Sequence, residues 1–405
     1  MEKPAIIGGK PILEEPLPKS NNVDKHEINA TMRVLKRGIL SDFVGREGEK
    51  FLGGEEVLNF EREFGKKFNM QHAVSFSSAT TALDAAVCAL GIKKGDEVIV
   101  SPYTMSASAT CILMNGATPV FVDIERETFN LDPKEIEKNI TKRTKAILVT
   151  NIFGGSAKYN EILNIARKYH LKLIEDNAQS IGAMFEGKYT GTIGDIGVFS
   201  FNCHKTIQCG EGGVLVTNNK DYAFRAQLKR NHGEVVLDDM NSEETILGSN
   251  YRLTEVGAAI ANEQLKKLDF LNEKRIELAD YLTKKLEGLP GISVPKRLKN
   301  SKHVYYAYPI LFDEKEFGLN RHIFCKAMNL EGFDLGEGYV KPLYYLKIFN
   351  SSAKCPVTEE LWDKKMILTH ICRYPLTYKH MDKFVEAIKK VEKYKGEISR
   401  FIGFK

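Results

Sequence analysis

Two residues near the middle of the chain, Asp176 and Lys205, are of types that could together act on an aldehyde and an amine. Asp176 follows the apolar run 171–174, which has the pattern of a buried parallel strand. Lys205 follows a second apolar run, 198–201, and precedes the turn Gly210-Glu211-Gly212-Gly213, which opens a third. Ligands bind at the carboxyl edge of open α/β sheets, so we expect Lys205 on a loop near that edge.

An acid at a strand end and a lysine on a nearby loop suit a pyridoxal phosphate enzyme. In such enzymes a lysine forms a Schiff base with the cofactor aldehyde, and an acid keeps the pyridine nitrogen protonated. Each residue alone is weak evidence, because an aspartate at a strand end is more often a cap and a lone lysine is usually solvated. A glycine-rich turn is equally common. Only the ordered set of residues predicts the cofactor.

The ordered set also resembles one family, the DegT/DnrJ/EryC1/StrS sugar aminotransferases, and the resemblance covers nearly the whole chain. It implies an α/β protein with the pyridoxal phosphate fold of the aspartate aminotransferase type (fold type I). Its large domain would hold a mostly parallel seven-stranded sheet, followed by a smaller α+β domain. We expect an arm over residues 1–25, the large domain over 26–268 and the small domain over 269–405. The motifs that carry the resemblance are Ile174 to Ala183, Gly194-Asp195, Phe199-Ser200-Phe201, Lys205 and Gly210 to Gly213.

The elements that must position these residues alternate along the chain. Strand and helix patterns follow one another from residue 98 to residue 170, which predicts right-handed βαβ units and a largely parallel sheet covered on both faces. Before them we expect helices over 24–37 and 56–69 and a strand over 72–76. After them we expect helices over 220–230, 256–266, 270–289, 320–330 and 378–394, a strand over 303–312 and a hinge at Pro290-Gly291.

Hydroxyl residues precede the helix that ends near Gly91. Free amides at a helix N-terminus, with hydroxyls beside them, form a ready phosphate site, although an ordinary Ser/Thr cap is the commoner reading. The resemblance assigns the cofactor phosphate to Thr80 and Thr81. It also implies that Gln179 hydrogen-bonds the phenolic oxygen of the cofactor or the nearby Schiff base, and it places Ser200 among the cofactor contacts.

The sequence departs from the family where an aromatic ring usually stacks on the cofactor. That ring directly follows the threonine of Pro102-Tyr103-Thr104-Met105, and this chain has Met105 there. A thioether can pack on an aromatic face, so Met105 could take this role. Tyr103 could instead turn inward toward the ring. A second departure lies in the segment 337–344, where the histidine that the family often has near the sugar is absent.

The resemblance also implies a homodimer with shared active sites. In the family the motif that matches Asn250 to Glu255 crosses to the other subunit, where the asparagine reaches the neighbour's cofactor phosphate and the arginine lies nearby. We carry these roles to Asn250 and Arg252. The residues alone indicate only an asparagine turn before an amphipathic helix.

Composition narrows the function further. With 405 residues, 43% of them hydrophobic and 27% charged, the chain is typical of globular proteins with two or three domains. A net charge of +5 without a basic block gives no case for nucleic-acid binding. We expect no membrane span and a cytoplasmic location, because no signal core or long apolar run occurs. We expect no metal, since Cys203, His204 and Cys209 lack a fourth ligand.

Together these residues predict an aminotransferase that moves an amino group from glutamate or glutamine to a keto sugar, nucleotide-linked, or to a keto cyclitol. Lys205 would hold the cofactor and move the proton, and Asp176 would stabilise the protonated pyridine. The main alternative is a sugar dehydratase of the same family, in which histidine replaces the lysine; Lys205 argues against it. A pyridoxal-binding regulator lacks its DNA-binding domain here, and a nicotinamide dehydrogenase lacks its glycine fingerprint. The acceptor, the carbon aminated and the stereochemistry stay open.

Overall fold

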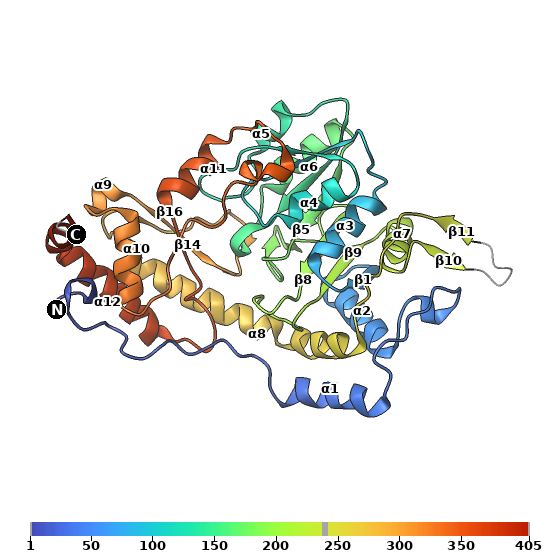
Figure 1. Cartoon of the computed structure of the whole chain (residues 1–405), viewed down its shortest axis with the longest axis horizontal. Helices are drawn as coiled ribbons and strands as arrows, with labels where there is room; N and C mark the ends of the chain where they lie inside the picture. The colour runs from blue at the N-terminus through green and yellow to red at the C-terminus, as the bar shows by residue number, and fades with distance from the viewer. Residues whose placement is uncertain (1, 237–241, 404–405) are drawn as a thin grey trace.

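A seven-stranded sheet forms the centre of the structure, a computed structural model that describes residues 2–236 and 242–403 (Figure 1). The strand order is β1-β9-β8-β5-β4-β2-β3. β9 runs antiparallel to both of its neighbours, and the other adjacent pairs are parallel. The mostly parallel sheet is therefore confirmed. The strands are β1 (His72–Phe76), β2 (Glu97–Val100), β3 (Thr118–Phe121), β4 (Thr144–Thr150), β5 (Lys172–Asp176), β8 (Ile196–Ser200) and β9 (Gly213–Thr217).

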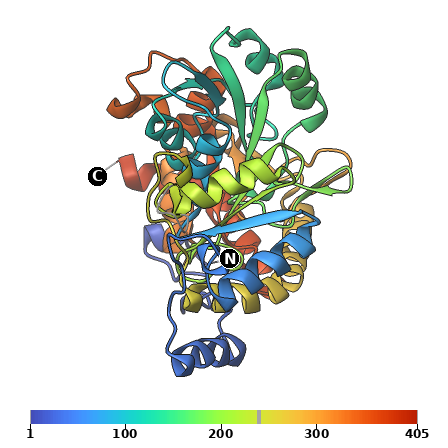
Figure 2. The same cartoon turned by 90° about the vertical axis from the view of Figure 1, so that its right-hand side faces the viewer.

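Helices cover both faces of this sheet, because its strands are apolar on both sides. In β4, Ala146 and Leu148 point into one core, and Ile147 and Val149 point into another. Figure 2 shows the same arrangement at β1, which has α7 on one side and α2 and α8 on the other. The helices of this region are α1 (Lys25–Arg37), α2 (Glu55–Phe68), α3 (Ala79–Ala89), α4 (Ala107–Met114), α5 (Pro133–Lys138), α6 (Tyr159–Lys168) and α7 (Lys220–Arg230).

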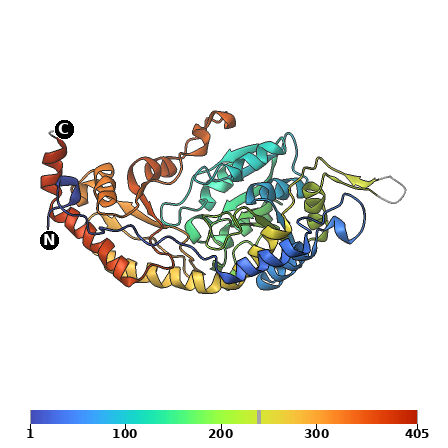
Figure 3. The same ribbon diagram turned by 60° about the horizontal axis from the view of Figure 1, so that its bottom comes forward.

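A single helix, α8 (Glu255–Leu286), joins the two halves of the molecule (Figure 3). The two separate helices expected over 256–266 and 270–289 were wrong, because neither glycine nor proline lies between them and the buried stripe continues through Leu268 and Leu271. Leu268 packs in the core beside the central sheet, and Leu282 packs in the C-terminal core. The domain boundary expected after residue 268 falls inside this helix and stays a prediction.

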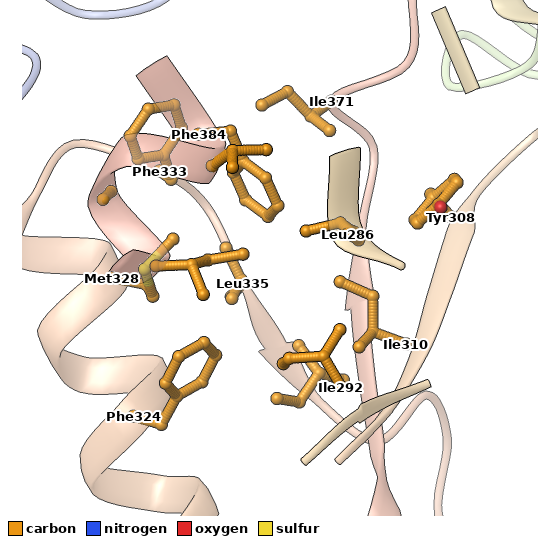
Figure 4. Packing of buried hydrophobic residues seen from close by; sticks show 14 of the residues in the cluster. Leu286, Ile292, Tyr308, Ile310, Phe324, Met328, Phe333, Leu335, Ile371 and Phe384 are labelled. Carbon is orange, nitrogen blue, oxygen red and sulfur yellow. The ribbon is translucent and has the colours of Figure 1, made fainter. Parts of the chain in front are cut away.

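The C-terminal half is built on an antiparallel sheet of order β12-β14-β16-β15. Its core lies between this sheet and the helices α10 and α12, and it includes Phe324, Phe333, Phe384 and Ile310 (Figure 4). The strand expected over 303–312 begins only at Tyr308, because Tyr305 has a φ of 48° and cannot continue an extended strand. The elements are β12 (Ile292–Ser293), β14 (Tyr308–Phe312), α9 (Glu314–Phe317), α10 (Arg321–Leu330), β15 (Gly336–Glu337), α11 (Pro356–Glu360), β16 (Met366–Thr369), α12 (Tyr378–Lys393) and α13 (Lys395–Gly403).

Two small sheets decorate this framework. One joins β6 (Met184–Phe185), β7 (Lys188–Tyr189) and β13 (Ser301–Lys302), and the other is the hairpin of β10 (Glu234–Val236) and β11 (Ser242–Thr245). That hairpin lies in the segment expected as a long polar loop. Across residues 2–236 and 242–403, no helix combines the length and the apolar character needed to cross a bilayer.

The N-terminal arm ties the two halves together on the outside. It starts beside the C-terminal helices and reaches α1, which packs on α8 (Figures 1 and 3). Its anchor is Glu331, whose buried carboxylate accepts hydrogen bonds from the backbone N–H groups of Ala5 (2.8 Å) and Ile12 (2.9 Å). Lys390 Nζ pairs with the same carboxylate at 3.0 Å. The arm is therefore held by a buried ion pair as well as by backbone hydrogen bonds.

The Glu331→Gln variant should release this arm. It leaves the ammonium of Lys390 buried without its counter-charge, which should lower the free energy of unfolding by about 3 kcal/mol. We expect a lower Tm in calorimetry and faster tryptic cleavage at Lys19. Glu386→Gln, an exposed position on α12, is the matched control and should change neither. Unchanged cleavage of the arm in Glu331→Gln would contradict the anchoring role.

Candidate active site

A cavity of about 720 Å³ lies where the carboxyl ends of the central strands face the C-terminal half. Both halves of the chain contribute side chains to it. The large-domain wall includes Ser78, Ala79, Thr80, Met105, Asp176, Ser200 and Lys205, and the opposite wall includes Arg275, Tyr306, Asp334, Tyr339, His370 and Arg373. Asp176 and Lys205, separated in the sequence by β6, β7 and β8, are brought to one cavity as expected.

Asp176 is a buried carboxylate at the end of β5, a strand in the middle of the sheet. Ser108 Oγ donates to its Oδ2 at 2.6 Å, and the N–H of Ala178 donates to its Oδ1 at 3.1 Å. Burial raises the pKa of Asp176, while these two hydrogen bonds and the charge of Lys205 act in the opposite direction. A cation bound beside Asp176 would offset the cost of burying its charge.

Lys205 lies on the loop after β8, and its N–H donates to the carbonyl of Asn202 at 2.8 Å. Its Nζ lies 4.7 Å from the centroid of the Tyr306 ring. Burial lowers the pKa of Lys205, and the negative charge of Asp176 opposes that shift. The neutral amine, which is the nucleophilic form, is therefore more accessible here than in an exposed lysine.

The N-terminus of α3 forms one end of the cavity. The first-turn amides of a helix have no intrahelical partners and favour an anion such as phosphate. Thr80 is exposed on the cavity wall. The hydroxyl of Thr81 is used inside the helix cap, where it donates to the carbonyl of Ser78 at 2.8 Å and accepts from the Ser78 N–H at 3.2 Å. Thr80 is thus free for a ligand, and Thr81 shapes the turn behind it.

The glycine-rich turn fixes the lysine loop against this helix end. A Cβ atom on Gly213 would lie 2.5 Å from the backbone N of Ala79 and 2.5 Å from the backbone of Ser78. Glycine at 213 is therefore required for the close approach of β9 to α3. Gly210 serves a different purpose, because its φ of +84° lies in the left-handed region.

The structure separates the two candidates for stacking on the ring. Met105 is 52% exposed and lines the cavity. Tyr103 is fully buried in a neighbouring core, where its hydroxyl donates to Met366 Sδ at 3.3 Å and accepts from the N–H of Tyr339 at 3.0 Å. Of these two side chains, Met105 has the position from which a bound ring could be reached.

Gln179 does not line the cavity itself, but it hydrogen-bonds Tyr339, which does. Its Nε2 donates to the hydroxyl of Tyr339 at 2.8 Å, and its Oε1 accepts from the N–H of Phe153 at 2.9 Å. Tyr339 lines the cavity, whereas Gln179 stands behind it. Ser200 lies on the wall, and its Oγ accepts from the N–H of Asn202 at 3.3 Å.

Asn250 and Arg252 lie apart from this cavity. Asn250 is exposed and forms an isolated β-bridge with Asn231. Arg252 donates to Oδ1 of Asn231 from Nε at 2.8 Å and from Nη2 at 2.5 Å. Neither lines the cavity of its own chain, so their expected service to a neighbouring subunit stays a prediction.

Sequence reasoning missed the residues of the C-terminal wall. Arg275, Tyr306 and Tyr339 come from three separate parts of the chain, and His370 and Arg373 share the segment after β16; no motif in the sequence links these parts. The segment 337–344 was noted only for its lost histidine, and Tyr339 lies within it. In the described part of the chain, no group of three or more His, Cys, Asp or Glu side chains could hold a metal ion.

Comparisons with known proteins agree with this geometry. Residues 44–389 match the model of the DegT/DnrJ/EryC1/StrS aminotransferase family. The GDP-perosamine synthase of Escherichia coli O157:H7 is 39% identical over 64% of this chain and 70% of that protein. The solved structure of Helicobacter pylori PseC, an aminotransferase involved in the biosynthesis of pseudoaminic acid, is 27% identical, with a TM-score of 0.83 over 94% of this chain and 100% of that one. An E. coli GDP-4-keto-6-deoxy-D-mannose-3-dehydratase with bound hydrated PLP is 26% identical, with a TM-score of 0.83 over 92% and 99% of the two chains.

The Gly213→Ala variant should weaken binding of pyridoxal phosphate. Its Cβ would push the start of β9 away from α3 and displace the phosphate-binding end of that helix; a loss of about 1–3 kcal/mol of binding free energy corresponds to roughly 5- to 150-fold in affinity. The Kd of the cofactor, measured by fluorescence on protein stripped of it, should rise accordingly. Gly45→Ala is the control, since a Cβ there meets nothing within 4 Å. Equal Kd values for the two variants would show that the close approach does not matter for the cofactor.

Proposed function

This chain belongs to the DegT/DnrJ/EryC1/StrS aminotransferase family and is a pyridoxal phosphate-dependent aminotransferase, and we propose that its acceptor is a nucleotide-linked keto sugar. The donor is glutamate or glutamine. The observation that carries the proposal is the meeting of Lys205 and Asp176 in one cavity beside the N-terminus of α3. The GDP-perosamine synthase and the UDP-4-amino-4,6-dideoxy-N-acetyl-beta-L-altrosamine transaminase among the relatives support a nucleotide-linked acceptor.

The residues of the cavity fit the cofactor. Asp176 is a buried carboxylate with hydrogen-bond donors but no hydrogen-bonded cation in the described chain, and it would hold the positive charge of the pyridine nitrogen. Thr80 and the first amides of α3 would bind the phosphate. Met105 would pack on the ring, and Lys205 would bind the aldehyde carbon. Bound there, pyridoxal phosphate supplies the electron sink for the pair left when the donor's α-carbon loses a proton.

Lys205 has two tasks in this proposal. Its amine, favoured in the neutral form by burial, first holds the cofactor through a covalent bond. With the donor amine in its place, the Lys205 amine would take the proton from the donor's α-carbon and later give it up again, so that one residue would serve as covalent anchor and as general base and acid. Tyr306 limits where this amine can move, because its ring lies beside Nζ.

A sugar dehydratase is the second candidate, and one solved neighbour is such an enzyme. His204 also lines the cavity, directly beside Lys205. Lys205 favours the aminotransferase, because its half-buried amine interacts with the charge of Asp176, whereas the side chain of His204 is exposed. An aminotransferase needs that amine as its covalent anchor.

The acceptor can be identified by its product. Purified protein should be yellow and should aminate at least one member of a panel of GDP-, UDP- and dTDP-linked keto sugars in the presence of glutamate or glutamine. Mass spectrometry would detect the replacement of a keto oxygen by an amino group. Lys205→Ala should form no product, and borohydride reduction of the native protein should place the pyridoxyl group on Lys205.

A pyridoxyl group on Lys188 or Lys220 would refute the assignment of Lys205. Loss of a hydroxyl without gain of nitrogen in the product would favour the dehydratase. Keto cyclitols belong in the same panel, and turnover of these alone would replace the nucleotide-linked acceptor by a cyclitol.

We also propose that the enzyme is a homodimer. Helix α1 buries Ala30 and Val34 against α8, yet its other side exposes Ile28, Met32 and Leu35, which are 58%, 45% and 50% exposed. Exposed apolar patches of this kind mark protein interfaces. A second copy of the chain covering this face would also bring a neighbour within reach of the exposed Asn250 and of Arg252.

Subunit exchange tests the shared site. A Lys205→Ala protomer and an Asn250→Ala, Arg252→Ala protomer should each be inactive or nearly so. In the heterodimer, one site combines the lysine of the second variant with the phosphate contacts of the first, and the other site carries both defects. Activity should therefore return after mixing, with exchange verified by native mass spectrometry. Exchange without recovered activity would remove Asn250 and Arg252 from the neighbour's site.

We propose that the reaction takes place in the cytoplasm. None of the seven cysteines, all of which lie in the described residues, forms a disulfide bond, as expected in a reducing compartment. Cys203 is exposed and lies two residues before Lys205 on the cavity wall, so its oxidation would alter the site. A reducing environment protects that position.

A further inference from the structure

The N-terminal arm contacts the loop that carries Lys205. Leu17, Ser20 and Asn22 of the arm line the cavity. The side-chain Nδ2 of Asn22 donates to the carbonyl of Thr206 at 2.9 Å, one residue after Lys205. Thr206 is buried, so its carbonyl would lose stabilisation if this donor were removed. The arm therefore contacts the backbone directly beside the reacting amine.

A second side chain, Gln264 of α8, holds both the arm and the lysine loop. Its Oε1 accepts from the N–H of Gln208 at 3.2 Å, and its Nε2 donates to the carbonyl of Asn22 at 3.0 Å. Lys267 Nζ donates to the same carbonyl at 2.8 Å. Gln264 is fully buried and does not line the cavity. Asn22 and Gln264 thus form a loop clamp, with one bond to the loop at Thr206 and one at Gln208.

The chemistry of its partners fixes the direction of each bond in the loop clamp. A carbonyl oxygen cannot donate, so Asn22 must present Nδ2 to Thr206, and Gln264 must present Nε2 to the carbonyl of Asn22. Nε2 of Gln264 also donates to the buried carboxylate of Glu27 on α1, at 2.9 Å. Glu27 in turn pairs with Lys267 of α8 at 2.6 Å. The loop clamp is therefore built on α1 and α8, which are joined to each other outside the cavity.

The backbone around Lys205 is held from both directions. On the preceding side, the N–H of Lys205 donates to the carbonyl of Asn202 at 2.8 Å. On the following side, the loop clamp holds Thr206 and Gln208, and Ile207 between them packs in the core beside α2. Only the side chain of Lys205 then has to reach into the cavity. Covalent attachment and proton transfer both depend on where its Nζ starts, because small misplacements slow such steps strongly.

We propose that Asn22 and Gln264 are positioning residues for Lys205, which makes the N-terminal arm a functional part of the active site. The inference rests on the role of Lys205 in the proposed function, and it holds for any acceptor. The two residues act through the lysine loop and bind neither the ring nor the phosphate of the cofactor. Loss of the loop clamp should therefore weaken only the attachment of the cofactor to Lys205.

Two forms of the cofactor separate positioning of the lysine from general damage to the site. The aldehyde carbon of pyridoxal phosphate can bond to Nζ of Lys205 with loss of water. Pyridoxamine phosphate has an amine at that carbon and can form no such bond. The Kd of each form is measured by fluorescence on protein stripped of cofactor. Lys205→Ala defines the full effect, and it should weaken pyridoxal phosphate while changing pyridoxamine phosphate little.

Asn22→Asp is the main variant, because a carboxylate has the size of the amide but cannot donate to the Thr206 carbonyl. The Kd of pyridoxal phosphate should rise about 3- to 30-fold, the range for one lost hydrogen bond, and that of pyridoxamine phosphate should stay within about twofold. Asn21→Asp is the matched control. It makes the same change one residue earlier, where Oδ1 accepts from the N–H of Val23 and can still do so. It should bind both forms like the native protein.

Gln264→Leu gives an independent measurement, because this buried side chain has no contact with a ligand in the cavity to lose. It should show the same selective loss of pyridoxal phosphate. If it does not fold, Asn22→Asp decides alone. In Asn22→Asp the rate of the donor half-reaction at saturating glutamate should also fall about tenfold, since the amine starts from a less favourable position.

An unchanged Kd of pyridoxal phosphate in Asn22→Asp would overturn the proposal. So would equal losses for the two cofactor forms, which would mean that Asn22 supports the pocket as a whole. In both cases a selective loss in Lys205→Ala would leave the proposed function standing. If Lys205→Ala instead bound pyridoxal phosphate as tightly as the native protein does, the covalent role of Lys205 would fail, and the positioning role of the loop clamp would fail with it.

Discussion

The buried carboxylate of Asp176, at the end of a central strand, is the group on which the arrangement of the site depends. Asp176 ends β5 with its carboxylate nearly removed from water, and it depends on Ser108, Ala178 and a nearby cation to stay ionised. Such a group is stable only where the surrounding elements are fixed. The central position of β5, between β4 and β8, provides that fixity. Lys205 comes from the loop after β8, one of the two strands beside β5.

Glu175, the residue before Asp176, helps to hold β8 beside β5. Glu175 is fully buried on the opposite face of β5, since successive side chains of a strand alternate. Its carboxylate accepts hydrogen bonds of 2.6 Å from the backbone N–H groups of Gly191, Ile193 and Gly194, and one of 2.5 Å from the hydroxyl of Tyr159. These bonds shape the turn that leads into β8. The two adjacent acids therefore have different roles. Glu175 positions β8, the strand before the loop of Lys205, and Asp176 faces the cavity.

The sequence predicted the features that depend on local patterns. It predicted less well the features that depend on tertiary packing. The strand around Leu173, the meeting of Asp176 with Lys205 and the glycine-rich turn follow from periodicity and from the rule for parallel sheets. The continuity of α8 did not, because a lysine-rich stretch beside Leu268 looks like a boundary until both of its cores are known. Neither did the burial of Tyr103, which depends on contacts with Met366 and Tyr339 far along the chain. The wall of Arg275 and Arg373 is assembled wholly by tertiary structure.

The continuity of α8 has a consequence for how such an enzyme can diversify. Each residue of an α-helix adds about 1.5 Å and turns the next side chain by about 100°. One residue inserted between Leu268 and Arg275 would therefore rotate Arg275 away from Tyr306 and put the C-terminal core out of register with the central one. The geometry of the cavity therefore does not allow the length of this helix to change. Variation in what the cavity accepts is left to segments such as 337–344, where the chain can lengthen or shorten without turning either wall.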